Sequence, residues 1–452
     1  MMTEAILNAY AQRFHDMTLC KSREDPWDLE WYTEGPFWRR TDMRYSREYK
    51  IIPDYEIADA KHGMSLGDIA VESERLESDL RSYRAQARPD ELPRTDYLIE
   101  HVHNLNVRTR MLLGEKMSFD QMSQGLYGLT APAYDYSRFD AIMEDLNAAL
   151  PGSGSAREKA LAFREKIAIP RESLLTVHYT DATVKEDPNF HGQATYRTTI
   201  VNVQNMEITG NSMPRVRVRE LPSKSMVFLS ILFGYDYNHL EYERNFNLLY
   251  PWTVDRVMDY IGHEMEPGHL TFFEKRLQTM IDTCWPEMGI VSQYSSSSAF
   301  TEGSARYAIS MCFGHSTEQQ LDFERELIFK PAGLDTGLVE LMPLWHRFCE
   351  ISGYGKLEAT RNMHDGKWNC EQAFDFLNGY AFLDRDATQE DVRALLDDPA
   401  HFVAHDYARD TVKAYFETVA PDVRDQWPLY EKLCRSHVTM QGILNKSFVP
   451  TV

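Results

Sequence analysis

Apolar side chains recur at three- and four-residue steps along much of the chain, which is the spacing that lines one face of an α-helix. Charged and polar residues fill most of the positions between them, as in helices that dock one face into a core. The predicted helices cover residues 3–20, 66–115 with breaks at Arg88-Pro89 and Leu92-Pro93, 136–150, and most of 320–435. This pattern predicts a mainly α fold.

One stretch departs from the helical spacing and has the composition of strands. Residues 174–220 contain runs of β-branched and aromatic side chains, and Val216-Arg217-Val218-Arg219 alternates apolar with charged positions. We therefore predict a small β-sheet over about 174–220. Beyond it, the helical period returns at Lys224–Leu240 and Trp252–Met265, so two helices are expected there.

The second of these helices ends in His263-Glu264-Met265-Glu266-Pro267-Gly268-His269, where two histidines bracket a carboxylate. On a straight helix, six residues turn the chain through about 600°, so His263 and His269 would point to different sides. Pro267 disfavours helix at the residue before it, and Gly268 can adopt a positive φ that reverses the chain. A break at this pair would bring the two imidazoles together.

The heptapeptide His-Glu-x-x-Pro-Gly-His resembles the motif of the DUF885 family, which are bacterial zincin-like metallopeptidases. A second family element, Glu-Gly on another helix, is matched by Thr301-Glu302-Gly303-Ser304-Ala305-Arg306-Tyr307, and the segment from His364 looks like a third. Thr360 replaces an acidic residue of the family, and a late Pro-Gly-Gln segment has no good counterpart. The resemblance implies a zincin-like metallohydrolase fold with an active-site cleft.

With this resemblance, His263 and His269 are expected to be neutral imidazole ligands of a metal, and Glu302 the third ligand. Two histidines and one carboxylate leave an open position for water, as in hydrolytic zinc sites. Glu264 would then serve as the catalytic base that takes the proton of that water. Zinc is the expected metal, with iron or manganese as alternatives because the same ligand set also binds non-haem iron.

Five other residues are candidates, each with a structural alternative. Tyr307 and His364 are catalytic candidates that could stabilise an oxyanion, although both residue types are also common in cores. Arg306, Arg361 and His191 are candidates for substrate binding, the arginines through a substrate carboxylate. Arg306 lies four residues after Glu302 and could instead form an ordinary ion pair, and His191 could be a loop histidine.

The clearest loop in the chain is Pro151-Gly152-Ser153-Gly154-Ser155, which is either a hinge or a turn. We expect residues 1–155 to form an N-terminal helical region that contributes part of the cleft or a lid. Residues 156–452 are expected to form the metal-binding catalytic region, with the small sheet followed by mostly helical structure.

The charge balance of the chain is strongly acidic. With 48 Lys and Arg against 69 Asp and Glu, the net charge is −21, which argues against nucleic acid or an anionic membrane surface as a partner. The six cysteines are scattered without a Cys-x-x-Cys pair, and no signal peptide or spanning helix is expected. These features predict a cytoplasmic protein that acts on a small molecule or short peptide; a homodimer is possible.

The leading hypothesis is a metal-dependent hydrolase that cleaves an amide bond in a peptide or a peptide-like small molecule. The alternative is a metal-dependent enzyme of small-molecule metabolism or biosynthesis on the same scaffold, either a lyase or an oxidative non-haem iron enzyme. A third hypothesis is a metal-free binding protein that retains the fold. The intact His263, Glu264, His269 and Glu302 count against the third.

Overall fold

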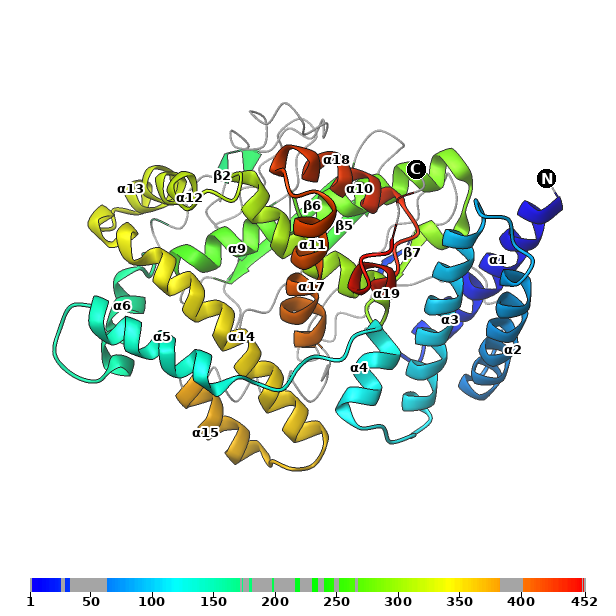
Figure 1. Cartoon of the computed structure of the whole chain (residues 1–452), viewed down its shortest axis with the longest axis horizontal. Helices are drawn as coiled ribbons and strands as arrows, with labels where there is room; N and C mark the ends of the chain where they lie inside the picture. Colours follow the sequence, from blue (N-terminus) through cyan, green and yellow to red (C-terminus); the bar gives the residue numbers. More distant parts are fainter. Residues whose placement is uncertain are drawn as a thin grey trace.

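Helices form most of the part of the chain that can be described, as the sequence predicts (Figure 1). The computed structural model describes residues 2–25, 29–32, 63–170, 173, 179–180, 197–198, 216–219, 230–234, 240–247, 252–264, 267–382, 401–448 and 450. Residues 26–28 and 33–62, most of the predicted sheet segment at 174–220, and residues 248–251 lie outside these residues.

Three N-terminal helices lie side by side at one end of the molecule, and a second group lies at the other end (Figure 1). The first group is α1 (Met2–Ser22), α2 (Leu66–Arg84) and α3 (Leu92–Leu112), and α4 (Phe119–Tyr127) packs against α3. The second group is α5 (Tyr136–Ala149), α6 (Ala156–Lys166), α12 (Thr317–Glu324), α13 (Lys330–Ala332), α14 (Met342–His364) and α15 (Cys370–Tyr380).

The helices between these groups carry the candidate site. They are α9 (Val254–Glu264), α10 (His269–Thr283), α11 (Ser296–Cys312), α17 (Ala408–Val419), α18 (Val423–Arg435) and α19 (Met440–Leu444). Short 3-10 turns occur at η1 (Pro286–Gly289) and η3 (Thr336–Leu341), and π-helical turns at η2 (Arg325–Phe329) and η4 (Val403–Tyr407).

Several helices begin at a residue whose side chain caps the free backbone amides of the first turn. Ser65, Ser118, Ser155 and Asn369 each accept a hydrogen bond from the residue three positions later, whose side chain bonds back to the capping residue. Ser155 ends the Pro-Gly-Ser loop in this way and starts α6, and the choice between a hinge and a turn stays a prediction. A domain boundary at 155 stays a prediction.

The strands are short and form three small sheets. β4 (Val216–Arg219) pairs in parallel with β6 (Leu240–Asn247), and β5 (Ser230–Gly234) pairs with β6 on its other side in antiparallel register. The helix predicted over Lys224–Leu240 is wrong, because the described part of that segment is β5. Short apolar runs fit both a buried strand and a helix, and the pairing with β6 decides between them. The remaining pairs are β1 (Leu29–Tyr32) with β7 (Ile290–Ser292), and β2 (Tyr179–Thr180) with β3 (Arg197–Thr198).

The largest buried apolar clusters join segments from both halves of the chain. One cluster packs residues of α5 and α6 against α9 and α14, and another packs α4 against α10, α11, α17 and α18. α11 lies in the middle of the second cluster, and all but a few of its residues are buried. A side chain on α11 is therefore held by helices on several sides.

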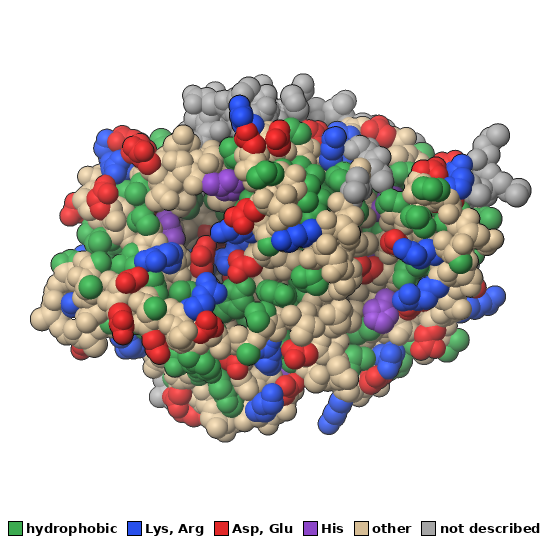
Figure 2. Space-filling view, viewed as in Figure 1, with side chains coloured by type: hydrophobic (Ala, Val, Ile, Leu, Met, Phe, Trp, Pro, Cys, Tyr) green, Lys and Arg blue, Asp and Glu red, His purple; other side chains and the backbone are tan. Residues whose placement is uncertain are grey.

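Lysine, arginine, aspartate and glutamate side chains are interspersed over the face shown in Figure 2, without a broad field of one sign. Within the described part of the chain, no helix is both long enough and apolar enough to span a bilayer.

Candidate metal centre

The chain breaks its helix between α9 and α10, at the Pro-Gly pair. α9 ends at Glu264, and α10 begins at His269 with Gly268 as its N-cap residue. The backbone amide of Gly268 donates across the break to the carbonyl of Gly262, at 3.0 Å. Tyr430 of α18 donates to the Pro267 carbonyl at 2.8 Å and holds the break in place. The predicted break is confirmed.

Gly268 is needed at this break for a reason other than the one expected. Its φ is −78°, so the predicted positive φ is wrong. A Cβ atom at this position would lie 1.7 Å from the carbonyl oxygen of His263, far inside any allowed contact. The backbone of the break folds back so closely on the end of α9 that only glycine fits.

Glu302 projects from the second turn of α11. Ser295 caps this helix by accepting a hydrogen bond from the amide of Ser298. Asn104 of α3 accepts hydrogen bonds from the amide and the hydroxyl of Ser296, at 3.1 and 3.0 Å. The serine run is thus buried and hydrogen-bonded, and it fixes the helix that presents the carboxylate.

A third histidine reaches the carboxylate from the π-helical turn that precedes α17. His405 Nε2 lies 2.8 Å from Glu302 Oε2. The close approach depends on Gly303, where a Cβ atom would lie 2.6 Å from the backbone carbon of Ala408. The glycine beside Glu302 therefore lets the backbone of α17 touch α11, which brings His405 to the carboxylate. Single π-helical turns are frequently found at functional sites.

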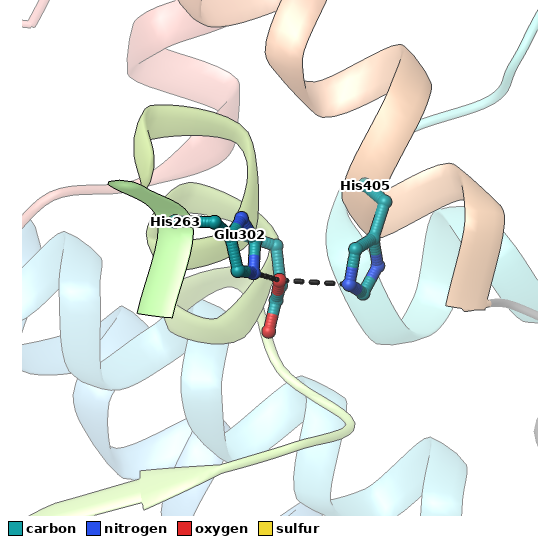
Figure 3. A group of neighbouring side chains, drawn as sticks. All are labelled: His263, Glu302 and His405. Carbon is teal, nitrogen blue, oxygen red and sulfur yellow. Dashed lines mark ion pairs between the residues drawn. The ribbon is translucent and has the colours of Figure 1, made fainter. Parts of the chain in front are cut away.

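The resulting cluster joins His263, Glu302 and His405 from three separate elements (Figure 3). His263 Nε2 lies 3.0 Å from Glu302 Oε2, the same oxygen that faces His405. One atom from each residue lies within 4.8 Å of the other two, which is the arrangement required to share one ion. The side chains of His263, Glu302 and His405 are only 9%, 13% and 11% exposed, so little water can solvate them.

The protonation pattern of the cluster suits a cation. His405 Nδ1 lies 2.9 Å from the carbonyl oxygen of His401, which can only accept, so Nδ1 carries the proton. In the neutral imidazole, Nε2 then carries no proton, and its lone pair points at a carboxylate oxygen of Glu302. Ligating histidines commonly show this backbone hydrogen bond on the other ring nitrogen.

The carboxylate oxygen at the centre is buried, and among the described residues it makes no hydrogen bond of normal geometry despite its two close histidine contacts. Burial opposes ionisation of Glu302, but the neighbouring His405, His269 and His263 side chains hold its pKa well below the usual range. An anionic carboxylate facing imidazole nitrogens in a dry site fits a divalent cation, whose charge would replace those protons.

The predicted ligand His269 is close, but it occupies a different place from the one expected. Its Nε2 lies 3.3 Å from Glu302 Oε1, on the other oxygen of the carboxylate, and it is not one of the three residues that share the common space. Its ring packs edge-on against His263 with 4.5 Å between ring centroids. The structure therefore brings together all three predicted ligands and adds His405, which the sequence analysis missed.

Charged residues also lie next to this cluster. Arg306 Nη1 binds Asp406 Oδ1 at 2.8 Å, so a residue one turn after Glu302 is tied to the residue next to His405. Asp259 lies one turn before His263. Burial would raise the pKa of Asp259, but nearby Arg306 and the other positive groups lower it. Arg306, predicted to bind substrate, thus makes an ion pair that joins the ligand-bearing elements.

Two predicted residues are held by contacts outside the cluster. His364 ends α14, and its Nε2 lies 2.9 Å from the carbonyl of Met117, just before α4. Arg361 donates to the carbonyls of Ala131 and Pro132, at 2.6 and 3.1 Å. Both side chains fasten α14 to the segments around α4, and their predicted roles in catalysis and substrate binding stay predictions.

Tyr307 is buried, and its hydroxyl donates to Gln426 Oε1 at 3.1 Å. Burial raises its pKa to about 12, so it stays protonated. His191 lies outside the described residues. Glu264 is placed as the last residue of α9, but its side chain lies outside what the structure describes.

Comparison with known proteins yields remote similarity alone. No family model matches the chain, and no curated protein matches it. Among solved structures, it is similar to a "putative lipoprotein" from Colwellia psychrerythraea, with 12% identity and a TM-score of 0.43 over 87% of this chain and 67% of that one. A second, a "putative lipoprotein of unknown function" from Shewanella oneidensis, has 16% identity and a TM-score of 0.40 over 86% and 74%.

Proposed function

We propose that the protein is a metal-dependent hydrolase that cleaves an amide bond in a peptide or a peptide-like small molecule. The observation that carries this proposal is the buried meeting of His263 Nε2, His405 Nε2 and Glu302 Oε2 in a space that one ion could fill. The sequence His-Glu-x-x-Pro-Gly-His supports it through the DUF885 resemblance, as does the zincin-like pairing of a histidine helix with a glutamate helix.

His263, Glu302 and His405 would hold the ion, and a zinc ion there would lower the pKa of bound water to about 7. The backbone carbonyl of His401 keeps the proton of His405 on Nδ1, so Nε2 stays available as a ligand. The Arg306–Asp406 pair fixes the spacing between the elements that carry Glu302 and His405. We assign Glu264, next to His263, as the base that takes the proton of the attacking water and returns it to the leaving nitrogen.

The number of ligands bears on the metal. Catalytic zinc keeps three protein ligands and an open fourth position, which His263, Glu302 and His405 would satisfy. If His269 also binds, four protein ligands would close a tetrahedral zinc site. A metal of higher coordination number, such as iron or manganese, would still have room for water or substrate with all four.

The position of His269 supports a second candidate function. Two histidines and one carboxylate are also the ligand set of non-haem iron, and an iron ion with room for a third histidine would suit an oxidative enzyme or a lyase of small-molecule metabolism. The proximity of His269 Nε2 to Glu302 Oε1, 3.3 Å, is the observation that favours it.

We further propose that the protein works in a reducing compartment, such as the cytoplasm. All six cysteines are free thiols, two of them exposed, which suits a compartment where thiols remain reduced.

The test uses the full chain loaded separately with zinc, iron or manganese. A mixture of short peptides and N-acyl amino acids is incubated in air and under nitrogen, and products are followed by mass spectrometry. We expect metal-dependent gain of water across an amide bond in both atmospheres. Glu264→Gln should keep the metal and lower the rate about 100- to 10,000-fold. Products that form only in air would instead support the oxidative candidate.

A further inference from the structure

A groove distinct from the metal centre runs between α3 and the C-terminal segment around α19. It has a volume of about 580 Å³, which is within the range of small-molecule sites. Glu100 and Asn104 of α3 form one wall, and Gln441 and Asn445 form the other.

The rim of the groove carries charges that are already neutralised. Arg84 forms an ion pair with Asp96 of α3. Arg81 pairs with Glu77 within α2, at 2.6 Å. An anionic ligand would have to compete with these carboxylates for the arginines, so the rim gives it little advantage.

The Glu100 carboxyl group faces the same groove and has a fixed orientation. The backbone amide of Met440 donates to Glu100 Oε1 at 3.0 Å. Gly128, which follows α4, also lies close, because a Cβ atom built on it would be 3.5 Å from that oxygen. Gln441 Nε2 is occupied by the Gly128 carbonyl, at 2.5 Å.

The partly buried Glu100 carboxyl group differs from the Glu287 and Asp406 carboxylates, each of which has a cation beside it. Glu287 forms ion pairs with Arg94 and His437, and Asp406 forms one with Arg306. Among the described residues, no lysine, arginine or histidine forms an ion pair with Glu100. It accepts a hydrogen bond from the Met440 backbone amide, and Ser296 and the Gln441 amide lie close to it.

We propose that this groove binds a small organic amine, whose ammonium group pairs with the Glu100 carboxylate. The ammonium would supply the charge that the protein itself does not place there. Apolar walls from Leu92, Pro93 and Ile99 suit a short hydrocarbon chain attached to the amine. This proposal is independent of the metal centre and of its reaction.

The titration of Glu100 gives the binding a signature. Burial raises its pKa to about 7, more than its hydrogen bonds lower it. The other charged and titratable groups that line the groove are Asp96 and His103 on the same helix, Arg81 and Arg84 on α2, and His437 before α19. An ammonium favours the ionised carboxylate, so binding near pH 7 should release a fraction of a proton.

The experiment is isothermal titration calorimetry of the full chain with cadaverine, using 1,5-pentanediol as its uncharged counterpart. Wild type is compared with Glu100→Gln, which keeps an oxygen for the Met440 amide. Glu144→Gln, at an exposed position of α5, is the matched control, because it removes the same charge from a protein of net charge −21. Asn445→Trp fills the groove without changing its charge.

We expect one cadaverine per chain, with heats that differ between buffers because a proton is released. Binding should be roughly ten- to hundredfold weaker in Glu100→Gln, as for loss of a charged hydrogen bond. It should also weaken in Asn445→Trp and stay unchanged in Glu144→Gln. The proposal is overturned if wild type shows no saturable binding, if pentanediol binds as well as cadaverine, or if Asn445→Trp binds normally. If Glu100→Gln does not fold by circular dichroism, the Asn445→Trp result decides.

Discussion

Two buried glutamates, Glu302 and Glu287, each meet histidines from the C-terminal part of the chain, yet the two clusters differ in what completes them. Glu287 is held by Arg94, whose Nη2 lies 3.0 Å from Oε2, and by His437, whose Nε2 lies 2.9 Å from Oε1. Both oxygens have donors, and Arg94 brings a permanent positive charge. This cluster needs nothing from outside the chain.

Glu302 is contacted by three imidazole rings, whereas Glu287 is contacted by one imidazole ring and the guanidinium of Arg94. His263 and His405 face one of its oxygens and His269 the other. An imidazole supplies charge only when it is protonated, whereas a guanidinium is always charged. The charge of a buried carboxylate can therefore be balanced by the fold itself, as at Glu287, or by a bound ligand, as we propose for Glu302. This difference separates a structural cluster from a candidate metal centre.

The largest effect is expected from removing the guanidinium of the structural cluster. Arg94→Leu leaves Glu287 buried with only His437 beside it, and breaking such a pair costs about 3–5 kcal/mol of unfolding free energy. Denaturant titration measures this cost. The matched control is Arg347→Leu, which removes an exposed partner of Asp145 and should cost much less. An equal cost for the two variants would contradict the role given to Arg94.

The stabilisation that the Glu287 cluster gives to the fold should be lost in acid. Burial opposes ionisation of Glu287, but His437 and Arg94 outweigh it and lower the pKa to about 2. The stabilisation is therefore complete above the unfolded value, near pH 4.5, and is lost as the pH falls from there toward 2. It amounts to roughly 3 kcal/mol.

The acid prediction is tested by comparing wild type with Glu287→Gln in the presence of a chelator. The gap between their unfolding free energies should narrow as the pH falls below 4.5. A gap that stays constant down to the lowest pH at which both fold would show that Glu287 does not titrate in this way.

The metal centre should respond to a change that leaves all its ligands intact. Gly303→Ala places a methyl group against the backbone of Ala408, and overpacking of this kind costs about 1–3 kcal/mol. If α17 moves away to relieve it, His405 moves with the helix and metal binding weakens. Competition with a chromogenic chelator measures the affinity. Gly379→Ala in α15 is the control, because nothing lies within 4 Å of its added Cβ.

A smaller effect is expected from Asp406, which touches Arg306 but no proposed ligand. Asp406→Asn weakens the link between α11 and the His405 turn, and loss of such supporting contacts typically lowers metal affinity 10- to 100-fold. The same chelator competition measures it. An unchanged affinity with a normal fold would show that the Arg306–Asp406 pair is incidental to the site.

The sequence predicted the features that depend on neighbouring residues. The helical period placed α1, α2, α3 and α5. The Pro-Gly break was also predictable, because no straight helix can bring together residues six positions apart. Its stereochemistry was not, since the need for Gly268 arises from contact with His263 and not from its own φ.

Features that depend on distant contacts escaped prediction. His401 and His405 have helical i, i+4 spacing, which could have marked the segment, but many helices carry such pairs without binding a metal. What selects His405 is the approach of α17 to Gly303. His364 and Arg361 were singled out by resemblance and motif position, whereas their hydrogen bonds to Met117, Ala131 and Pro132 could be seen only in the fold.

The most direct test of the central claim is elemental analysis of wild type, Glu302→Gln and Glu287→Gln, each equilibrated with zinc and passed through a desalting column. The two variants remove the same charge from the two clusters. We predict about one metal ion per chain in wild type and in folded Glu287→Gln, and close to none in Glu302→Gln. Equal metal in Glu302→Gln and wild type would contradict the assignment of this cluster as a metal centre.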